Sequence, residues 1–144
     1  MNALRKLHSA LVPGGTLVDI HPIPPDEQAE AGGEVLGRID ERTFFEIVSA
    51  TENELASSGL FELEAEVERD VFERFDTTEE FFEIVGDREG VRIPGGLARR
   101  VRAASPPIDL RERVVFRRYR ARRGVLRRGL TKAALFSQMT KSFD

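Results

Sequence analysis

The sequence predicts an α/β protein in which helices flank a sheet of about three strands, the last two long and antiparallel. Apolar and charged residues alternate with a period of two in residues 61–68 of an expected strand over 61–75, and residues 110–122 combine apolar residues with repeated arginines. The first of these strands carries four alternating glutamates at residues 62–68 and the second carries repeated arginines, so the two are expected to pair. A chain of 144 residues with no cysteine predicts one domain without disulfides or thiol chemistry.

The first elements follow from spacing and turn residues. Residues 3–12 place leucines at helical intervals and predict an amphipathic helix, which a Pro-Gly-Gly turn ends. Residues 16–20 are apolar on both faces except for Asp19, which is typical of a strand inside a sheet. The prolines that follow His21 predict an extended segment that ends this strand. Residues 26–33 are expected to form a polar, mobile loop.

The middle of the chain predicts a second helix. Residues 34–40 are compatible with a short edge strand. Residues 41–58 predict a helix with Asp40 as its N-cap and a Ser-Ser-Gly stop, although residues 44–48 alone would also suit a strand.

Short helices are expected before the last strand and after it. Thr77 and Glu80 have the spacing of a capping box, which predicts a helix over residues 78–85. A basic helix is expected at residues 97–104, where a Pro-Pro pair ends it. Within the basic C-terminal tail, residues 131–139 are also compatible with a helix.

The charges are unevenly distributed along the chain. Residues 1–90 carry 7 Lys/Arg and 22 Asp/Glu, whereas residues 91–144 carry 15 Lys/Arg and 3 Asp/Glu. The expected strand pairing predicts that much of this charge is neutralised within the fold. Arginines beyond Arg120 have no such partner, which leaves an acidic protein surface or nucleic acid as an alternative. Aromatic residues are too sparse there for a base-stacking platform, so nucleic acid is not the expected partner.

No apolar run approaches the roughly 20 residues that a membrane span needs, and the N-terminal helix lacks the apolar core of a signal peptide. These two features predict a cytoplasmic protein with no membrane partner.

Several segments, in order, resemble the second half of class I S-adenosylmethionine-dependent methyltransferases. They are LVPGGTLVDI at 11–20, ELASSGLF at 54–61, FDTTEEFF at 75–82 and VVFRRY at 114–119. The resemblance implies a partial Rossmann-like methyltransferase sheet, with residues 1–121 as a C-terminal subdomain and residues 122–144 as a basic tail. It also implies methyl transfer from S-adenosylmethionine to a small nucleophile, in a pocket that residues 21–60 would shape.

The chain departs from that family where the cofactor binds. The family holds S-adenosylmethionine with a glycine-rich loop and an acidic residue, and both would precede Leu4. The Gly-Gly pairs of this sequence lack the G-x-G-x-x-G spacing. Cofactor-binding residues are therefore unknown, and the chain is not expected to be active alone.

The resemblance also implies a particular arrangement of the strands. It places the strand of residues 16–20 beside that of residues 110–122, with residues 61–75 outside. The other edge of residues 16–20 would then be free, which favours a homodimer or a complex with a separate N-terminal half. The alternative function is a non-enzymatic interaction module that assembles with itself or with a partner chain.

His21 and Asp19 are the predicted catalytic residues. They lie two positions apart and therefore share one strand face, at the expected carboxyl end of the strand, where open α/β sheets place their active sites. His21 would act as a base toward a methyl-accepting hydroxyl or nitrogen. The competing interpretation is that His21 begins a loop and Asp19 is a satisfied polar group. The two histidines, His8 and His21, have no metal-binding spacing, so no metal is predicted.

Overall fold

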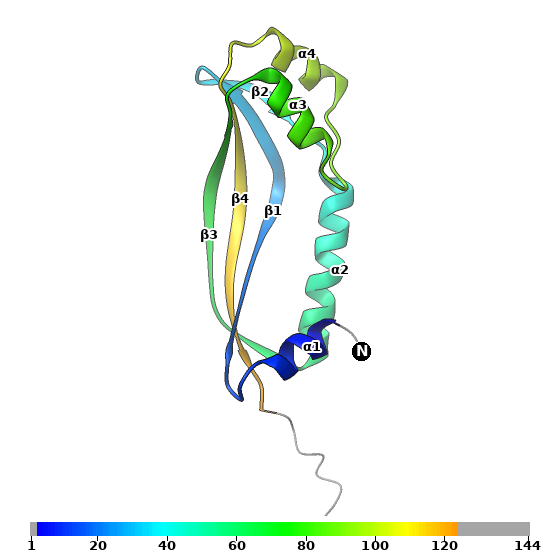
Figure 1. Ribbon diagram of the computed structural model, residues 1–144, viewed down its shortest axis with the longest axis vertical. Helices are drawn as coiled ribbons and strands as arrows, with labels where there is room; N and C mark the ends of the chain where they lie inside the picture. Colours follow the sequence, from blue (N-terminus) through cyan, green and yellow to red (C-terminus); the bar gives the residue numbers. More distant parts are fainter. Residues whose placement is uncertain (1–2, 124–144) are drawn as a thin grey trace, which may run out of the picture.

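The computed structural model describes residues 3–123, which form an α/β fold with an open, four-stranded antiparallel sheet (Figure 1). The strands are β1 (Thr16–Ala31), β2 (Glu34–Arg38), β3 (Phe61–Phe75) and β4 (Ile108–Ala121), in the order β2-β1-β4-β3. The helices are α1 (Ala3–Ala10), α2 (Arg42–Ser58), α3 (Thr78–Gly86) and α4 (Gly95–Ala103). As expected, β1 lies beside β4, and β3 lies beyond it. The predicted count of about three strands is wrong, because β2 adds a fourth at the edge.

β1 has 16 residues, about three times the five predicted at 16–20, so the expected strand end at His21 and the loop at residues 26–33 are wrong. β1 pairs with β4 at residues 16–23 and again from Gln28, with a register shift between them. Its prolines lie at and beside this irregularity, where β1 has a neighbour on one side only and a missing amide donor costs little. β2 pairs only with residues 28–31. Within the described part of the chain, one edge of residues 16–23 is therefore unpaired.

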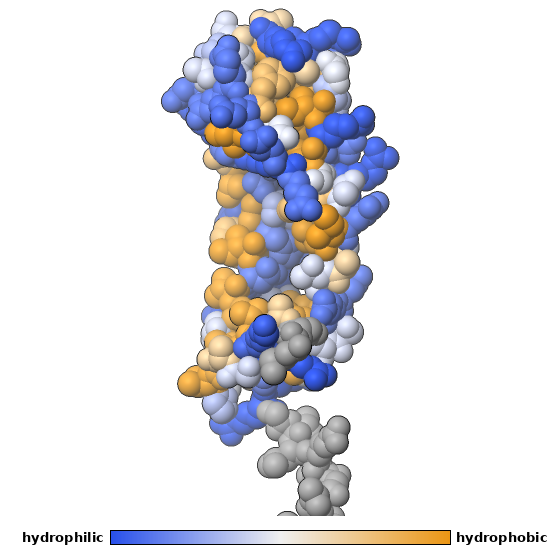
Figure 2. Space-filling model, turned by 45° about the vertical axis from the view of Figure 1, so that its right-hand side comes forward, coloured by the Kyte–Doolittle hydropathy of each residue, from blue (hydrophilic) through white to orange (hydrophobic). Residues whose placement is uncertain are grey.

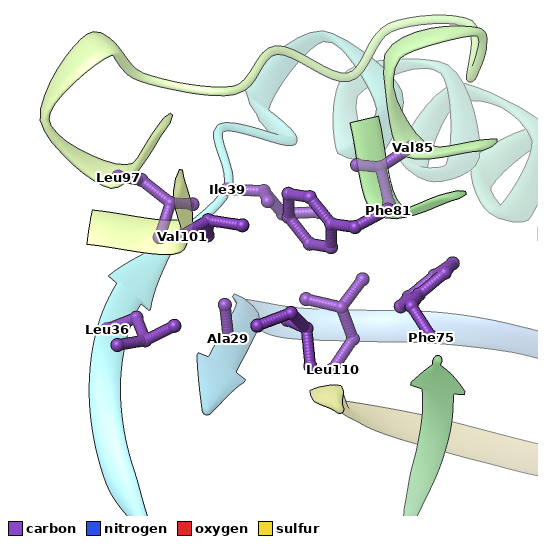
Figure 3. Packing of buried hydrophobic residues seen from close by; sticks show 10 residues of the cluster. Ala29, Leu36, Ile39, Phe75, Phe81, Val85, Leu97, Val101 and Leu110 are labelled. Carbon is purple, nitrogen blue, oxygen red and sulfur yellow. The ribbon is translucent and has the colours of Figure 1, made fainter. Parts of the chain in front are cut away.

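The principal core lies at the end of the sheet that α3 and α4 cover (Figures 1 and 3). Its fully buried members come from both helices and from the strand ends: Ala29, Ile39, Phe75, Phe81, Val85, Leu97, Val101, Ile108 and Leu110. Phe75 and Phe81 meet edge to face with ring centroids 5.5 Å apart. This core anchors β2, α3 and α4 on the sheet.

The opposite end has a much smaller core. Leu55, Phe61 and Ala121 are buried there, and the leucines of α1 pack on them only in part. α2 spans the distance between the two ends along one face of the sheet (Figure 1). Between these two ends, the layer between α2 and the sheet contains a large share of polar side chains.

Among residues 3–123, no helix covers the central part of the sheet face turned away from α2 (Figure 1). Asp19 and His21 point toward α2, so the alternation along β1 turns Val18 and Ile20 away from it. Val18 is 58% exposed and Ile20 is 57% exposed. On the side that carries α2, Figure 2 also shows hydrophobic side chains at the surface among charged ones.

The local signals at the helix ends are largely confirmed. Thr77 accepts a hydrogen bond from the Glu80 amide at 3.1 Å, as a capping box requires, while the Glu80 carboxylate accepts from the Asp76 amide. Gly59 ends α2 with φ of 68°. The prediction of Asp40 as the N-cap is wrong by one residue, because Glu41 occupies the N-cap position. Asp40 nevertheless accepts a bond from the Arg42 amide at 3.2 Å.

The predicted charge neutralisation between β3 and β4 is confirmed. Arg113 pairs with Glu68 at 2.9 Å and Arg117 with Glu66 at 2.6 Å, and Glu64 takes both Arg118 and Arg120. The expected helix at residues 131–139 lies outside the described residues. In the part of the chain that is described, no helix has the length and apolar character to cross a membrane.

Candidate functional site

His21 lies between two carboxylates that come from different elements. Its Nδ1 is 2.9 Å from Asp19 Oδ2 on the same strand, and its Nε2 is 2.9 Å from Glu52 Oε1 on α2. The ring is 11% exposed, whereas the two carboxylates are about one-third exposed. The sheet thus supplies the histidine and one carboxylate, and the helix packed on that face supplies the other.

Arg117 of β4 completes this cluster. It ion-pairs with Glu52 and donates from Nε to Glu66 of β3 at 2.6 Å. Burial works against its charge, but the hydrogen bonds to Glu66 and Glu52 outweigh burial and raise the Arg117 pKa. We call Asp19, His21, Glu52, Glu66 and Arg117 the histidine cluster. It contains three carboxylates and one permanent cation, and His21 is a further proton acceptor.

A cavity of about 290 Å³ adjoins the histidine cluster between α1, α2 and β1. Leucines from all three elements, with Ile47 and Val48 of α2, form most of its wall. Asp19, His21 and Glu52 supply its polar side. A mainly apolar hollow with a few convergent polar groups is the usual form of a site for a small organic ligand.

The structure brings together the two residues predicted as catalytic, but for a different reason from the one expected. His21 is in the middle of β1 rather than at its carboxyl end, because the strand continues to Ala31. The placement of the site therefore depends on α2, which brings Glu52 onto the same sheet face. His8 is on exposed α1, and its ring lies 2.7 Å from the Arg122 carbonyl oxygen.

The geometry limits what His21 can do. Both of its nitrogens lie at hydrogen-bonding distance from a carboxylate, and only a ring with both protons donates to both. To act as a base, the ring must leave one carboxylate. Glu52 is the one that can be exchanged, because Arg117 also binds it, while Asp19 can hold the ring through Nδ1.

A second polar cluster lies under the other half of α2, and the sequence did not indicate it. Arg88, in the loop after α3, ion-pairs with Glu73 and with Glu27. The Glu27 amide donates to Glu41 Oε2 at 2.7 Å, and Glu112 faces the same space. We call these five residues the glutamate cluster. They line part of a cavity of about 440 Å³ whose remaining wall is largely apolar.

The glutamate cluster has more carboxylates than Arg88 can neutralise. Burial raises the pKa of Glu27 to about 8, and the charge of Glu41 contributes. Burial raises the Glu41 pKa to about 7 and also raises that of Glu112. Carboxyl groups that keep a proton near neutral pH are typical of functional sites, although structural clusters have them too.

One signal in the sequence would have found Glu52. Val48, Glu52 and Leu55 share the buried side of α2, so a carboxylate interrupts an otherwise apolar helix face. Glu27 and Glu41 had no such signal. Glu27 was in a segment taken for a loop, and Glu41 is one of many acidic residues near a helix start.

The described residues do not fit S-adenosylmethionine in the manner of the resembled family. Gly14-Gly15 joins a helix to a strand, and Gly32-Gly33 is the β1–β2 turn. Gly95-Gly96 opens α4 but follows a loop rather than a strand. No group of three or more His, Asp or Glu side chains in residues 3–123 is arranged to hold a metal ion.

Comparison with protein-family models, curated proteins and solved structures found no match to this chain. The fold and the two clusters define an α/β protein with an open sheet and a histidine-bearing cavity.

Proposed function

We propose that this chain is the acceptor-side part of an S-adenosylmethionine-dependent methyltransferase-like protein, and that another polypeptide segment supplies the cofactor site. The observation that carries the proposal is the strand order. β4 runs antiparallel between β1 and β3, and the unpaired edge of β1 is on the side where the resemblance expects the rest of the sheet.

The cavity beside His21 supports the acceptor side of this proposal. Its apolar wall suits the body of a small organic acceptor, and its polar side suits a hydroxyl or amine. His21 would pass its Nε2 proton to Glu52, exchange its bond to Glu52 for one to that group and take that group's proton, while Asp19 holds the ring. Because the described residues do not fit the cofactor, the other polypeptide segment would hold the methyl donor.

Calorimetric titration tests the proposal. S-adenosylmethionine injected into the chain alone should give no binding heat. The same injection into the chain co-purified with the polypeptide encoded directly upstream should give a saturable one. Failure of the two to associate, or a complex that binds no cofactor, would overturn the proposal. Binding heat from the chain alone would overturn the requirement for a second part.

In an active complex, His21→Gln should lower kcat by about 100-fold or more while cofactor affinity stays within about twofold, since general bases contribute about 10²–10⁴ to the rate. His8→Gln is the matched control, because His8 lies on exposed α1 and outside the cavity. Unchanged kcat in His21→Gln would remove His21 from the reaction.

An interaction module without catalysis is the second candidate. The observation in its favour is the unpaired edge of residues 16–23, next to the exposed side chains of Val18 and Ile20. A strand edge of this kind offers backbone donors and acceptors to another chain. Stable assembly combined with no cofactor binding in any complex would favour this function over methyl transfer.

A further inference from the structure

The unpaired edge of β1 is complementary to itself in one particular register. In an antiparallel pair of identical strands, the residues that face each other have numbers with a constant sum, and one residue lies on the twofold axis. The side chains that face each other also lie on the same side of the sheet. These two conditions leave few arrangements for the short run between Thr16 and the first proline of β1.

With Ile20 on the axis, Asp19 of each copy faces the partner's His21. Each imidazole would then lie close to two aspartates, its own at 2.9 Å and the partner's across the new pair. On the other face, Ile20 meets the partner's Ile20, and Val18 meets the partner's Pro22. Hydrogen-bonding side chains are therefore matched on one face and apolar side chains on the other.

Two other registers are less favourable. With Asp19 on the axis, two carboxylates would face each other directly, and like charges across a pair are destabilising. With Val18 on the axis, each Asp19 would face an apolar Leu17. The prolines at 22, 24 and 25 lack an amide donor and prevent the pairing from extending farther along β1.

We infer that in the isolated chain this edge of β1 pairs with the same edge of a second copy, antiparallel, with Ile20 at the twofold axis. The pairing joins two four-stranded sheets into one and buries part of the exposed Val18 and Ile20 side chains. It does not depend on the proposed methyltransferase function. The interface is small, so we expect dissociation constants in the micromolar range.

Single cysteines test the register, because the chain has none of its own. Across a twofold axis at Ile20, the two copies of residue 20 have Cα atoms roughly 4.5–5.5 Å apart, which suits a disulfide. The two copies of residue 16 would be about 26 Å apart at roughly 3.3 Å per residue. Ile20→Cys should therefore form a covalent dimer under mild oxidation, whereas Thr16→Cys should not.

Light scattering on the unmodified chain at about 100 µM should give the mass of a dimer. This concentration is well above the micromolar dissociation constant expected for an interface of this size. A monomer under these conditions would overturn the inference, and cross-linking of Thr16→Cys as fast as Ile20→Cys would overturn the register. Val35→Cys on β2 is the control: Val35 is 61% exposed, so this variant measures the cross-linking that random collision produces.

A charge on the axis gives a second measurement. Ile20→Lys should abolish the dimer because two ammonium groups would meet there, and circular dichroism should remain native because the side chain is 57% exposed. Val35→Lys, on β2, should leave the dimer unchanged. An Ile20→Lys variant that is folded and still dimeric would contradict the pairing.

Discussion

The two halves of the layer between α2 and the sheet differ in how their charges are balanced. The glutamate cluster sets four carboxylates against Arg88 and lies next to the dense core under α3 and α4. The histidine cluster sets three carboxylates against Arg117, with His21 hydrogen-bonded to two of them, next to the small core at α1. The end with the dense core therefore supports a charge imbalance that protonation relieves. At the end with the small core, charged side chains have ion-pair partners, and the edge of β1 is unpaired.

The largest expected effect comes from the dense core. Phe81→Ala should lower the free energy of unfolding by about 3–5 kcal/mol, because a fully buried aromatic ring is replaced by a cavity. Chemical denaturation measures it. Phe72→Ala is the matched control: the Phe72 side chain is 58% exposed, so its loss should cost less than about 1 kcal/mol. Equal losses would mean that the α3–α4 end does not hold the fold together.

Glu27→Gln tests the charge imbalance. The pKa of Glu27 is raised from 4.5 to about 8, so the folded chain keeps a proton that the unfolded chain releases. The stability from this group is fully present below pH 4.5 and is lost as the pH rises through about 8. The variant should therefore be less sensitive to pH over this range and more stable than wild type at alkaline pH. The gain should be a few kcal/mol, since each pKa unit corresponds to about 1.4 kcal/mol.

Denaturation series between about pH 5 and pH 9 measure the effect of Glu27→Gln. This range includes the raised Glu27 pKa of about 8, so the group titrates within it. Glu83→Gln, on the exposed side of α3, is the control and should leave the shape of the pH profile unchanged. A Glu27→Gln profile parallel to wild type would show that Glu27 does not keep its proton in the fold.

Arg117→Leu removes the permanent cation of the histidine cluster. Glu52 and Glu66 would lose their shared partner, and we expect a loss of about 1–3 kcal/mol in unfolding free energy. Arg113→Leu, with a side chain 47% exposed, should cost less than about 1 kcal/mol. In a double-mutant cycle, Glu52→Gln should cost less in the Arg117→Leu background than in wild type. Additive losses would contradict the coupling.

The smallest expected effect is in hydrogen exchange. Alternate amides of residues 16–21 face the unpaired edge of β1, so in the monomeric Ile20→Lys variant they should exchange faster than those of residues 109–115. β4 has a neighbour on both sides along that stretch. Mass spectrometry of the exchanged peptides measures the difference. Equal protection would mean that something within the chain covers the edge.

Local patterns predicted most of the elements because their signals act over a few residues. The alternation in residues 61–75 is confirmed as β3, the capping box as the start of α3, and Gly59 as the end of α2. The two errors in β1, its predicted end at His21 and the predicted loop at residues 26–33, have a common cause. Proline and acidic residues indicate a loop when taken alone, but in β1 the hydrogen bonds to β4 hold residues 16–31 as one strand.

The sequence alone predicted most of the helices and strands, the pairing of the two long later strands, and that Asp19 and His21 share a face. These follow from residue spacing and from charge pairing between neighbours. Only the tertiary structure decided that α2 lies over that face, that Glu52 and Arg117 complete the histidine cluster, and that Glu27 and Glu41 are buried together. Such proximities depend on how distant segments pack, and burial and carboxyl pKa values exist only once that packing has formed.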